Sequence, residues 1–205
     1  MTGLLLKDLY TLGRQMRIYI LLILIFALLP GNTLYAFAIM YAAMLPYTAL
    51  AYDERSHWIQ LARMMPCTTM QLAACKYVLG WLAVAVATVF TAVGTALSPL
   101  WGVARQEALD HLVSLPALIG AALLMMAVSL PLMFRFGVER GRSFFWILLI
   151  VFALAVPLLA AQSSGSGGES PVVFWLIAAG LPAAGILAQP VSIALSAKWL
   201  AASER

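Results

Sequence analysis

Charged residues are scarce in this chain. They make up 10% of its 205 residues, whereas hydrophobic residues make up 64%. A soluble domain carries roughly a quarter charged residues, so the scarcity excludes a soluble protein. It predicts an integral membrane protein with a single transmembrane domain over residues 1–205. The net charge of +4 is small and its basic residues lie between apolar runs. We expect this charge to reflect membrane topology, with no nucleic-acid partner.

Residues that carry catalysis or bind metals are also rare. The two cysteines, Cys67 and Cys75, give no case for a disulfide or a metal site. The two histidines, His57 and His111, are predicted on opposite sides of the membrane. The chain has no H-E-x-x-H, no G-x-S-x-G and no phosphate loop ending in G-K-[ST]. We therefore expect no catalytic, cofactor-binding or metal-binding residues. An intramembrane enzyme is disfavoured because the predicted span cores supply no His, Asp or Glu.

Apolar runs predict an all-α membrane protein with six transmembrane helices. The first two form a tight hairpin that turns at Pro30-Gly31-Asn32. Whether 18–29 crosses fully is left open, because a span needs about 20 residues. Pro182 and Pro190 interrupt the last run, either as a moving kink or as tolerated kinks. The expected spans are about 16–30, 33–52, 77–97, 114–134, 143–161 and 172–197.

Lysine and arginine are unevenly distributed between the two sides. Six spans put both termini on one side, which then holds eleven of the twelve basic residues, and the other side holds only Arg105. Cytoplasmic segments carry the excess of Lys and Arg, so we predict that both termini and residues 52–76 are cytoplasmic. A single crossing by 18–51 would put eight basic residues outside and four inside, which favours the hairpin.

A polar stretch, residues 52–76, separates the second and third spans. Within it Trp58, Leu61, Ala62 and Met65 follow the spacing i, i+3, i+4 and i+7 of one helix face. The pattern predicts a short amphipathic helix outside the bilayer core. Two interpretations stay open: a helix that rests on the lipid headgroups, and a docking element for a soluble partner.

Capping residues mark the ends of this helix, predicted over Asp53–Met65. Asp53 is expected to be its N-cap, with Glu54 in the first turn, where negative charge is favoured. Pro66 ends it. Thr68 and Gln71 have the spacing of a capping box, so a second helix is expected to start there.

The N-terminal stretch, residues 4–17, carries one apolar and one polar stripe. This pattern predicts an interfacial helix in the membrane plane, or else the wet end of the first span. The apolar stripe is Leu5, Leu9, Leu12 and Met16, and the polar stripe is Lys7, Thr11 and Arg14.

Three stretches together resemble a known family. They are Gly3-Leu-Leu-Leu-Lys7-Asp8-Leu-Tyr10; Ala51-Tyr52-Asp53-Glu54 with Trp58, Met65-Pro66 and Lys76-Tyr77; and Phe136-Gly137-Val138-Glu139-Arg140-Gly141-Arg142. In this order and topology the chain is similar to the small six-span permease subunits of bacterial type-2 ABC exporters, which include staphylococcal-type amphipathic-peptide exporters. It departs from them at Cys67-Thr68-Thr69, where relatives are expected to carry a basic residue.

The resemblance implies partners and a function. Two permease subunits, alike or different, would pair with two cytoplasmic ABC ATPase subunits that hold ATP and Mg. They would export an amphipathic peptide or another hydrophobic compound across the bacterial cytoplasmic membrane. The alternative is a non-transporting membrane scaffold or immunity protein. The implied coupling helix would dock on the ATPase through Asp53, Glu54, Arg55, Trp58, Leu61, Ala62 and Met65, and the implied interfacial helix carries Lys7, Leu9, Leu12 and Arg14.

Overall fold

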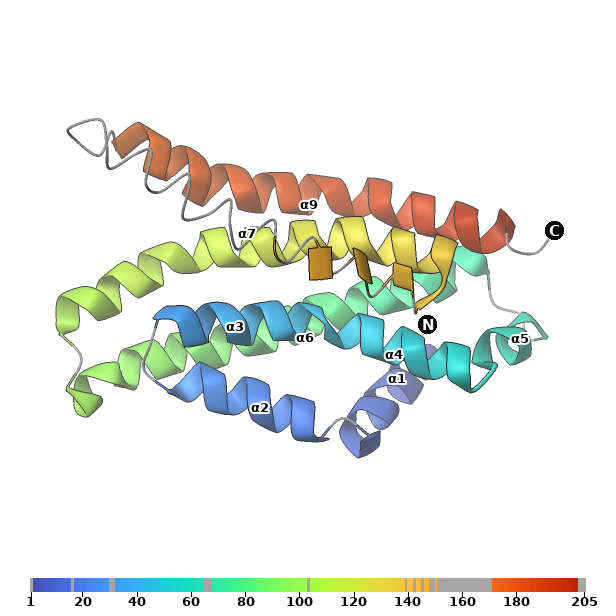
Figure 1. The fold of residues 1–205 in the computed structure, drawn as a ribbon, viewed down its shortest axis with the longest axis horizontal. Coiled ribbons are helices and arrows are strands. Elements are labelled where there is room, and N and C mark those ends of the chain that lie inside the picture. The colour runs from blue at the N-terminus through green and yellow to red at the C-terminus, as the bar shows by residue number, and fades with distance from the viewer. Residues whose placement is uncertain are drawn as a thin grey trace.

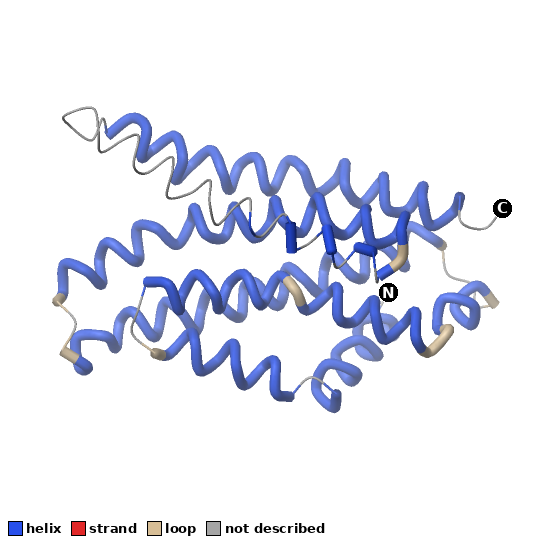
Figure 2. The backbone as a smooth tube through the Cα atoms, viewed as in Figure 1, coloured by secondary structure: helices blue, strands red, loops and turns tan. Residues whose placement is uncertain are grey.

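The structure is a computed structural model. It describes residues 2–15, 17–29, 32–64, 68–102, 104–138, 140–141, 143–144, 146–147, 150 and 171–202. Every regular element in these residues is a helix (Figures 1 and 2), as the all-α prediction requires. The elements are α1 (Thr2–Gln15), α2 (Arg17–Leu28), α3 (Asn32–Ala43), α4 (Leu45–Arg55), α5 (Trp58–Arg63), α6 (Thr69–Leu97), the 3₁₀ helix η1 (Ser98–Trp101), α7 (Arg105–Phe136) and α9 (Pro171–Ala202).

Four stretches of the described chain are long and apolar enough to cross a membrane: Leu34–Arg55, Thr69–Leu100, His111–Phe136 and Ala179–Ala201. They correspond to the expected second, third, fourth and sixth spans. The helix at the expected first span, α2, has 12 residues and is therefore about 18 Å long, short of the roughly 30 Å of a hydrocarbon core. The expected fifth span, 143–161, lies mostly outside the described residues, so the number six stays a prediction.

Proline and glycine shape the first hairpin. The α-helical hydrogen bonding is interrupted at Met44, between α3 and α4. Pro46, in the first turn of α4, has no N–H to donate to the preceding turn. The helices α2 and α3 pack side by side (Figure 1), and both contact α6. A Cβ on Gly94 of α6 would collide with the Ala27 carbonyl of α2. Gly94 therefore allows the short α2 to approach the backbone of α6.

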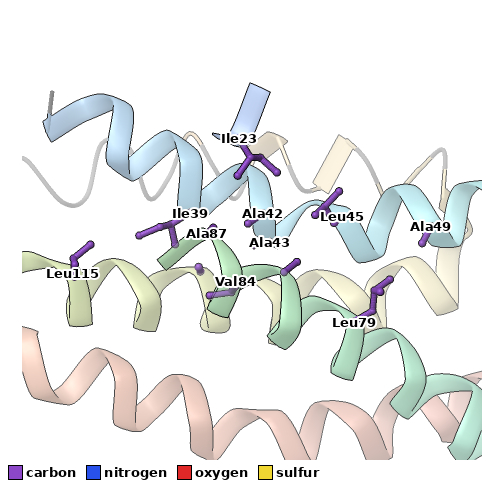
Figure 3. Close-up of a cluster of buried hydrophobic side chains, with 12 residues drawn as sticks. Ile23, Ile39, Ala42, Ala43, Leu45, Ala49, Leu79, Val84, Ala87 and Leu115 are labelled. Carbon is purple, nitrogen blue, oxygen red and sulfur yellow. The ribbon is translucent and has the colours of Figure 1, made fainter. Parts of the chain in front are cut away.

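The contacts between the long helices include an apolar cluster and a close approach of two backbones. A cluster of small and branched side chains joins α2, α3, α4, α6 and α7 (Figure 3), with Ile39, Leu79 and Val84 among its buried members. On the other side α7 and α9 approach closely, because Gly120 faces the backbone of Pro182 and Gly185 lies against the Gly120 carbonyl. The chain continues through Pro182 and Pro190 as one α-helix, α9.

The segment between the third and fourth expected spans is largely helical. Those spans were placed at 77–97 and 114–134, but η1 occupies Ser98–Trp101 and α7 already begins at Arg105. The polar residues after Gly102 are adequate helix formers and contain no breaker. They therefore extend the apolar helix by about two turns, although the hydropathy falls.

Different helices gather at the two ends of the bundle. The helices α1 and α5, the start of α6 and the ends of α7 and α9 gather at one end, and η1 and the start of α7 lie at the other (Figure 1). We call the first the basic end. It carries Lys7, Arg55, Lys76, Arg135 and Lys198.

Candidate functional site

Four charged side chains meet at the basic end in a closed ring of ion pairs. The ammonium Nζ of Lys76 lies 2.7 Å from Asp8 Oδ2 and 2.5 Å from Asp53 Oδ2. The ammonium of Lys7 lies 3.0 Å from Asp8 Oδ1 and also pairs with Asp53 Oδ1. Each charge thus has two partners of opposite sign. The ring joins α1, α4 and α6, and its net charge is zero.

The ring is withdrawn from solvent. The side chains of Asp8, Asp53 and Lys76 are at most 7% exposed, and that of Lys7 is 26% exposed. Isolated charges in such a place would be costly, and complete pairing offsets that cost. Lys7 has a further partner, because its Nζ lies 4.5 Å from the centre of the Trp58 ring, within the range of a cation–π contact.

Glu54, the residue after Asp53 in α4, connects this helix to the residues that follow α7. Its Oε2 accepts a hydrogen bond from the Val138 N–H at 2.9 Å. Val138 follows Gly137, which ends α7 with φ 79° and ψ 165°, a conformation open essentially to glycine alone. A Cβ on Gly137 would also lie 3.2 Å from Glu54 Oε1. Glycine is thus required at position 137 for the carboxylate to reach the backbone beyond α7.

The predicted N-cap at Asp53 is wrong. The helix α4 continues through Arg55, so Asp53 lies in its last turn, inside the ring. The next helix, α5, starts only at Trp58, after His57 with φ 53°, and it has no side-chain cap. The apolar pattern of the second span had no stop signal before Asp53, so the helix runs on until the left-handed residue His57 turns the chain.

The apolar face predicted for the coupling helix is exposed only in part. Ala62 is fully buried and Trp58 is half-buried against Lys7, whereas Leu61 is 53% and Met64 88% exposed. Met65 lies outside the described residues. The exposed stripe is His57, Gln60, Leu61 and Met64. It has the same i, i+3, i+4, i+7 spacing, shifted by one residue. The shift accompanies the contact of Trp58 with Lys7, which turns Trp58 toward the ring of ion pairs.

The other predicted features of this region have mixed outcomes. The capping box is confirmed: Thr68 Oγ1 accepts from the Gln71 N–H at 3.2 Å, Gln71 Oε1 accepts from the Thr68 N–H, and α6 begins at Thr69. Pro66 lies outside the described residues. The N-terminal helix is present as α1, with Leu9 and Arg14 exposed. Its position in a membrane plane stays a prediction.

A line of hydroxyl groups continues from the ring into the bundle. The residue after Lys76, Tyr77, places its OH 2.5 Å from Ser192 Oγ and 2.8 Å from Ser196 Oγ on α9. Ser192 Oγ also donates to the Ala127 carbonyl at 2.5 Å. That carbonyl lacks its helical partner because residue 131 is proline. Hydroxyls therefore join α6, α7 and α9 beside the ring.

The structure brings the three resembling stretches into contact. Lys7 and Asp8 come from the first, Asp53, Glu54, Trp58 and Lys76 from the second, and Val138 from the third. Reasoning from sequence had assigned no role to Asp8 or Lys76. The available signal was their charge: each lies at the edge of an apolar stretch, where an unpaired charge is unfavourable.

Residues 3–200 match the family described as ABC-2 family transporter protein. No curated protein and no solved structure gives a significant match. Permeases of this family generally work with an ATPase subunit and another permease. The match covers nearly the whole sequence, and the described helices include four that are able to cross a membrane. The chain therefore belongs to the ABC-2 transporter family, as a multi-pass membrane permease subunit of an ABC transporter.

Proposed function

We propose that this chain is the permease of an exporter in the bacterial cytoplasmic membrane and that α5 docks on its cytoplasmic ATPase. The supporting observation is the exposed stripe of Leu61 and Met64, flanked by His57 and Gln60, on a short helix held over a buried charge ring. The family supplies the kind of partner, since its permeases generally work with an ATPase subunit. ATP and Mg bind to that subunit, and this chain holds no cofactor.

The orientation follows from charge. The basic end is cytoplasmic because Lys and Arg concentrate on the cytoplasmic side of membrane proteins, and the opposite end carries Arg105. Both termini are then cytoplasmic, and α5 lies on the side where ATP is available. The cargo is an amphipathic peptide or another hydrophobic compound, which passes between this permease and a second copy or a paralogue.

Pull-down with the ATPase tests the docking. Leu61→Ala and Met64→Ala each remove an exposed apolar side chain from α5, and we expect both to reduce the ATPase that copurifies with the chain. The control is Leu100→Ala, because Leu100 is 82% exposed at the opposite end. Undiminished ATPase binding by the Leu61→Ala/Met64→Ala double variant would contradict docking through α5. It would favour a helix that rests on the lipid headgroups and a non-transporting membrane scaffold.

A further inference from the structure

We propose that Asp53 and Lys76 form the joint through which displacement of α5 reaches the membrane-spanning helices. This inference rests on the proposed docking of α5 and assigns positioning roles to two buried residues beneath it. Asp53 lies in the last turn of α4 and Lys76 in the second turn of α6. Their side chains meet at 2.5 Å.

The short connection between α4 and α5 is the first step. Only Ser56 and His57 separate the end of α4 from the start of α5, and backbone bonds from Ser56 to Tyr52 and from His57 to Glu54 close this turn. A force on α5 is therefore delivered to the last turn of α4. That turn carries Asp53 on one side and Glu54 on the other.

The contact with α6 is the second step. A helix of 29 residues, α6 extends through the bundle and packs against α2, α3, α7 and α9. Directly after Lys76, the Tyr77 OH contacts Ser192 and Ser196 of α9. Movement of this turn of α6 is thus transmitted to α9 by the hydrogen bonds of Tyr77.

Buried charge is better suited to fixing geometry than to adding stability. Apolar replacements of buried ion pairs are often neutral or stabilising, and in some proteins a buried polar group fixes one arrangement. Apolar side chains of α4 and α6 already pack in one cluster. The ion pair adds a constraint on the last turn of α4, because any separation there leaves both charges desolvated and unpaired.

The ring topology separates the joint from the anchoring of α1. Removing Lys7 and Asp8 leaves the Asp53–Lys76 pair, so α4 stays bound to α6. Removing Lys7 and Asp53 leaves the Asp8–Lys76 pair, so α1 keeps its ionic contact with α6 while the last turn of α4 loses its own. Each change removes one positive and one negative charge. Lys7→Gln/Asp8→Asn is therefore the matched control for Lys7→Gln/Asp53→Asn.

The first readout is coupling. Both double variants are reconstituted with the ATPase that copurifies with the wild-type chain, and uptake of a dye-labelled amphipathic peptide into inside-out vesicles is divided by ATP hydrolysed. Both double variants lose the Lys7–Trp58 contact, so they are compared with each other. We expect both to bind the ATPase, and we expect the ratio of transport to ATP hydrolysis to be at least tenfold lower in Lys7→Gln/Asp53→Asn than in Lys7→Gln/Asp8→Asn. Equal ratios in the two variants would overturn the joint.

The second readout needs neither cargo nor ATPase. Spin labels at Ser56→Cys beside α5 and Val86→Cys on the exposed face of α6 report their separation in a chain without its native cysteines. The distance distribution should broaden in Lys7→Gln/Asp53→Asn and not in Lys7→Gln/Asp8→Asn, and equal widths contradict the joint. If the wild-type chain binds no ATPase, the proposed function fails while this readout still decides the joint. If Lys7→Gln/Asp53→Asn does not fold, Asp53→Leu/Lys76→Met gives the same comparison.

Discussion

Asp53 and Glu54 are neighbours whose carboxylates bind on different sides of α4. Asp53 pairs with Lys7 of α1 and Lys76 of α6, whereas Glu54 accepts the Val138 N–H beyond α7. Successive side chains on a helix point about 100° apart, so one turn of α4 reaches two neighbours. The last turn of α4, which leads into α5, is thereby held by contacts on two sides.

The ring yields a prediction about single and paired substitutions. Lys76→Met leaves two buried carboxylates with one lysine, and an uncompensated buried charge costs about 3 kcal/mol of unfolding free energy. Lys7→Gln/Asp8→Asn removes two charged groups yet keeps the ring neutral, so we expect a smaller loss. Reversible unfolding in mixed micelles measures both. A double variant less stable than Lys76→Met contradicts the closed ring.

Gly137 yields a second prediction. Gly137→Ala forces a Cβ into a glycine-only conformation and against Glu54, so we expect a loss of about 1–3 kcal/mol and weaker protection of the Val138 amide from hydrogen exchange. Gly180→Ala is the matched control, because Gly180 lies within α9 with open space around it. There alanine favours the helix by about 0.5–1 kcal/mol. Equal effects at the two positions would refute the constraint.

Local patterns predicted the helices and the cap of α6 well. The apolar runs identified four of the segments that are able to span, and the Thr68–Gln71 spacing identified the start of α6. Both signals act within a few residues, where helix periodicity and capping are determined. The end of α4 was missed, because no local breaker stands before His57 and the turn depends on a left-handed residue.

The ring was not predictable from such patterns. Asp8, Asp53 and Lys76 are far apart in sequence, and single-sequence periodicity gives no distance between helices. Burial of Asp53 also moved the exposed face of α5, because Trp58 covers Lys7 while Leu61 and Met64 remain exposed. A charge near an apolar run indicated that a partner exists, but only tertiary packing determined which one.

His57 yields a third prediction. Its φ of 53° is uncommon for a residue with a Cβ, and a β-branched side chain is especially disfavoured there. We expect His57→Val to destabilise the chain by about 1–2 kcal/mol and His57→Gly to be tolerated. Thermal unfolding in detergent distinguishes them. If valine is tolerated as well as glycine, the turn between α4 and α5 does not require a left-handed residue.

Orientation yields a fourth prediction. In a chain without its native cysteines, Arg105→Cys should react with an impermeant maleimide added to intact cells, because the opposite end is predicted to face outward. Met64→Cys, which replaces an 88% exposed side chain, should react only after the cells are permeabilised. Labelling of Met64→Cys in intact cells would reverse the proposed orientation and remove α5 from the side that holds ATP.

The Ser192 hydroxyl yields the last prediction. It donates to the Ala127 carbonyl at 2.5 Å, which Pro131 leaves without a helical donor. Ser192→Ala leaves that carbonyl unsatisfied, at a cost of about 1–3 kcal/mol, while Tyr77 keeps Ser196. Ser114→Ala is the control, because the Ser114 Oγ donates to the His111 carbonyl within its own helix. We expect that control to stay within about 0.5 kcal/mol of wild type.

A second substitution isolates the cause of this effect. Pro131→Ala supplies the missing N–H, which is able to bond to the Ala127 carbonyl within α7. In that background Ser192→Ala should cost clearly less than it does alone, and a double-mutant cycle of unfolding free energies measures the difference. Equal costs in both backgrounds would mean that Ser192 stabilises the bundle through Tyr77 alone. A reduced cost would show that a hydroxyl on α9 compensates for the proline of α7 beside the turn of α6 that carries Lys76.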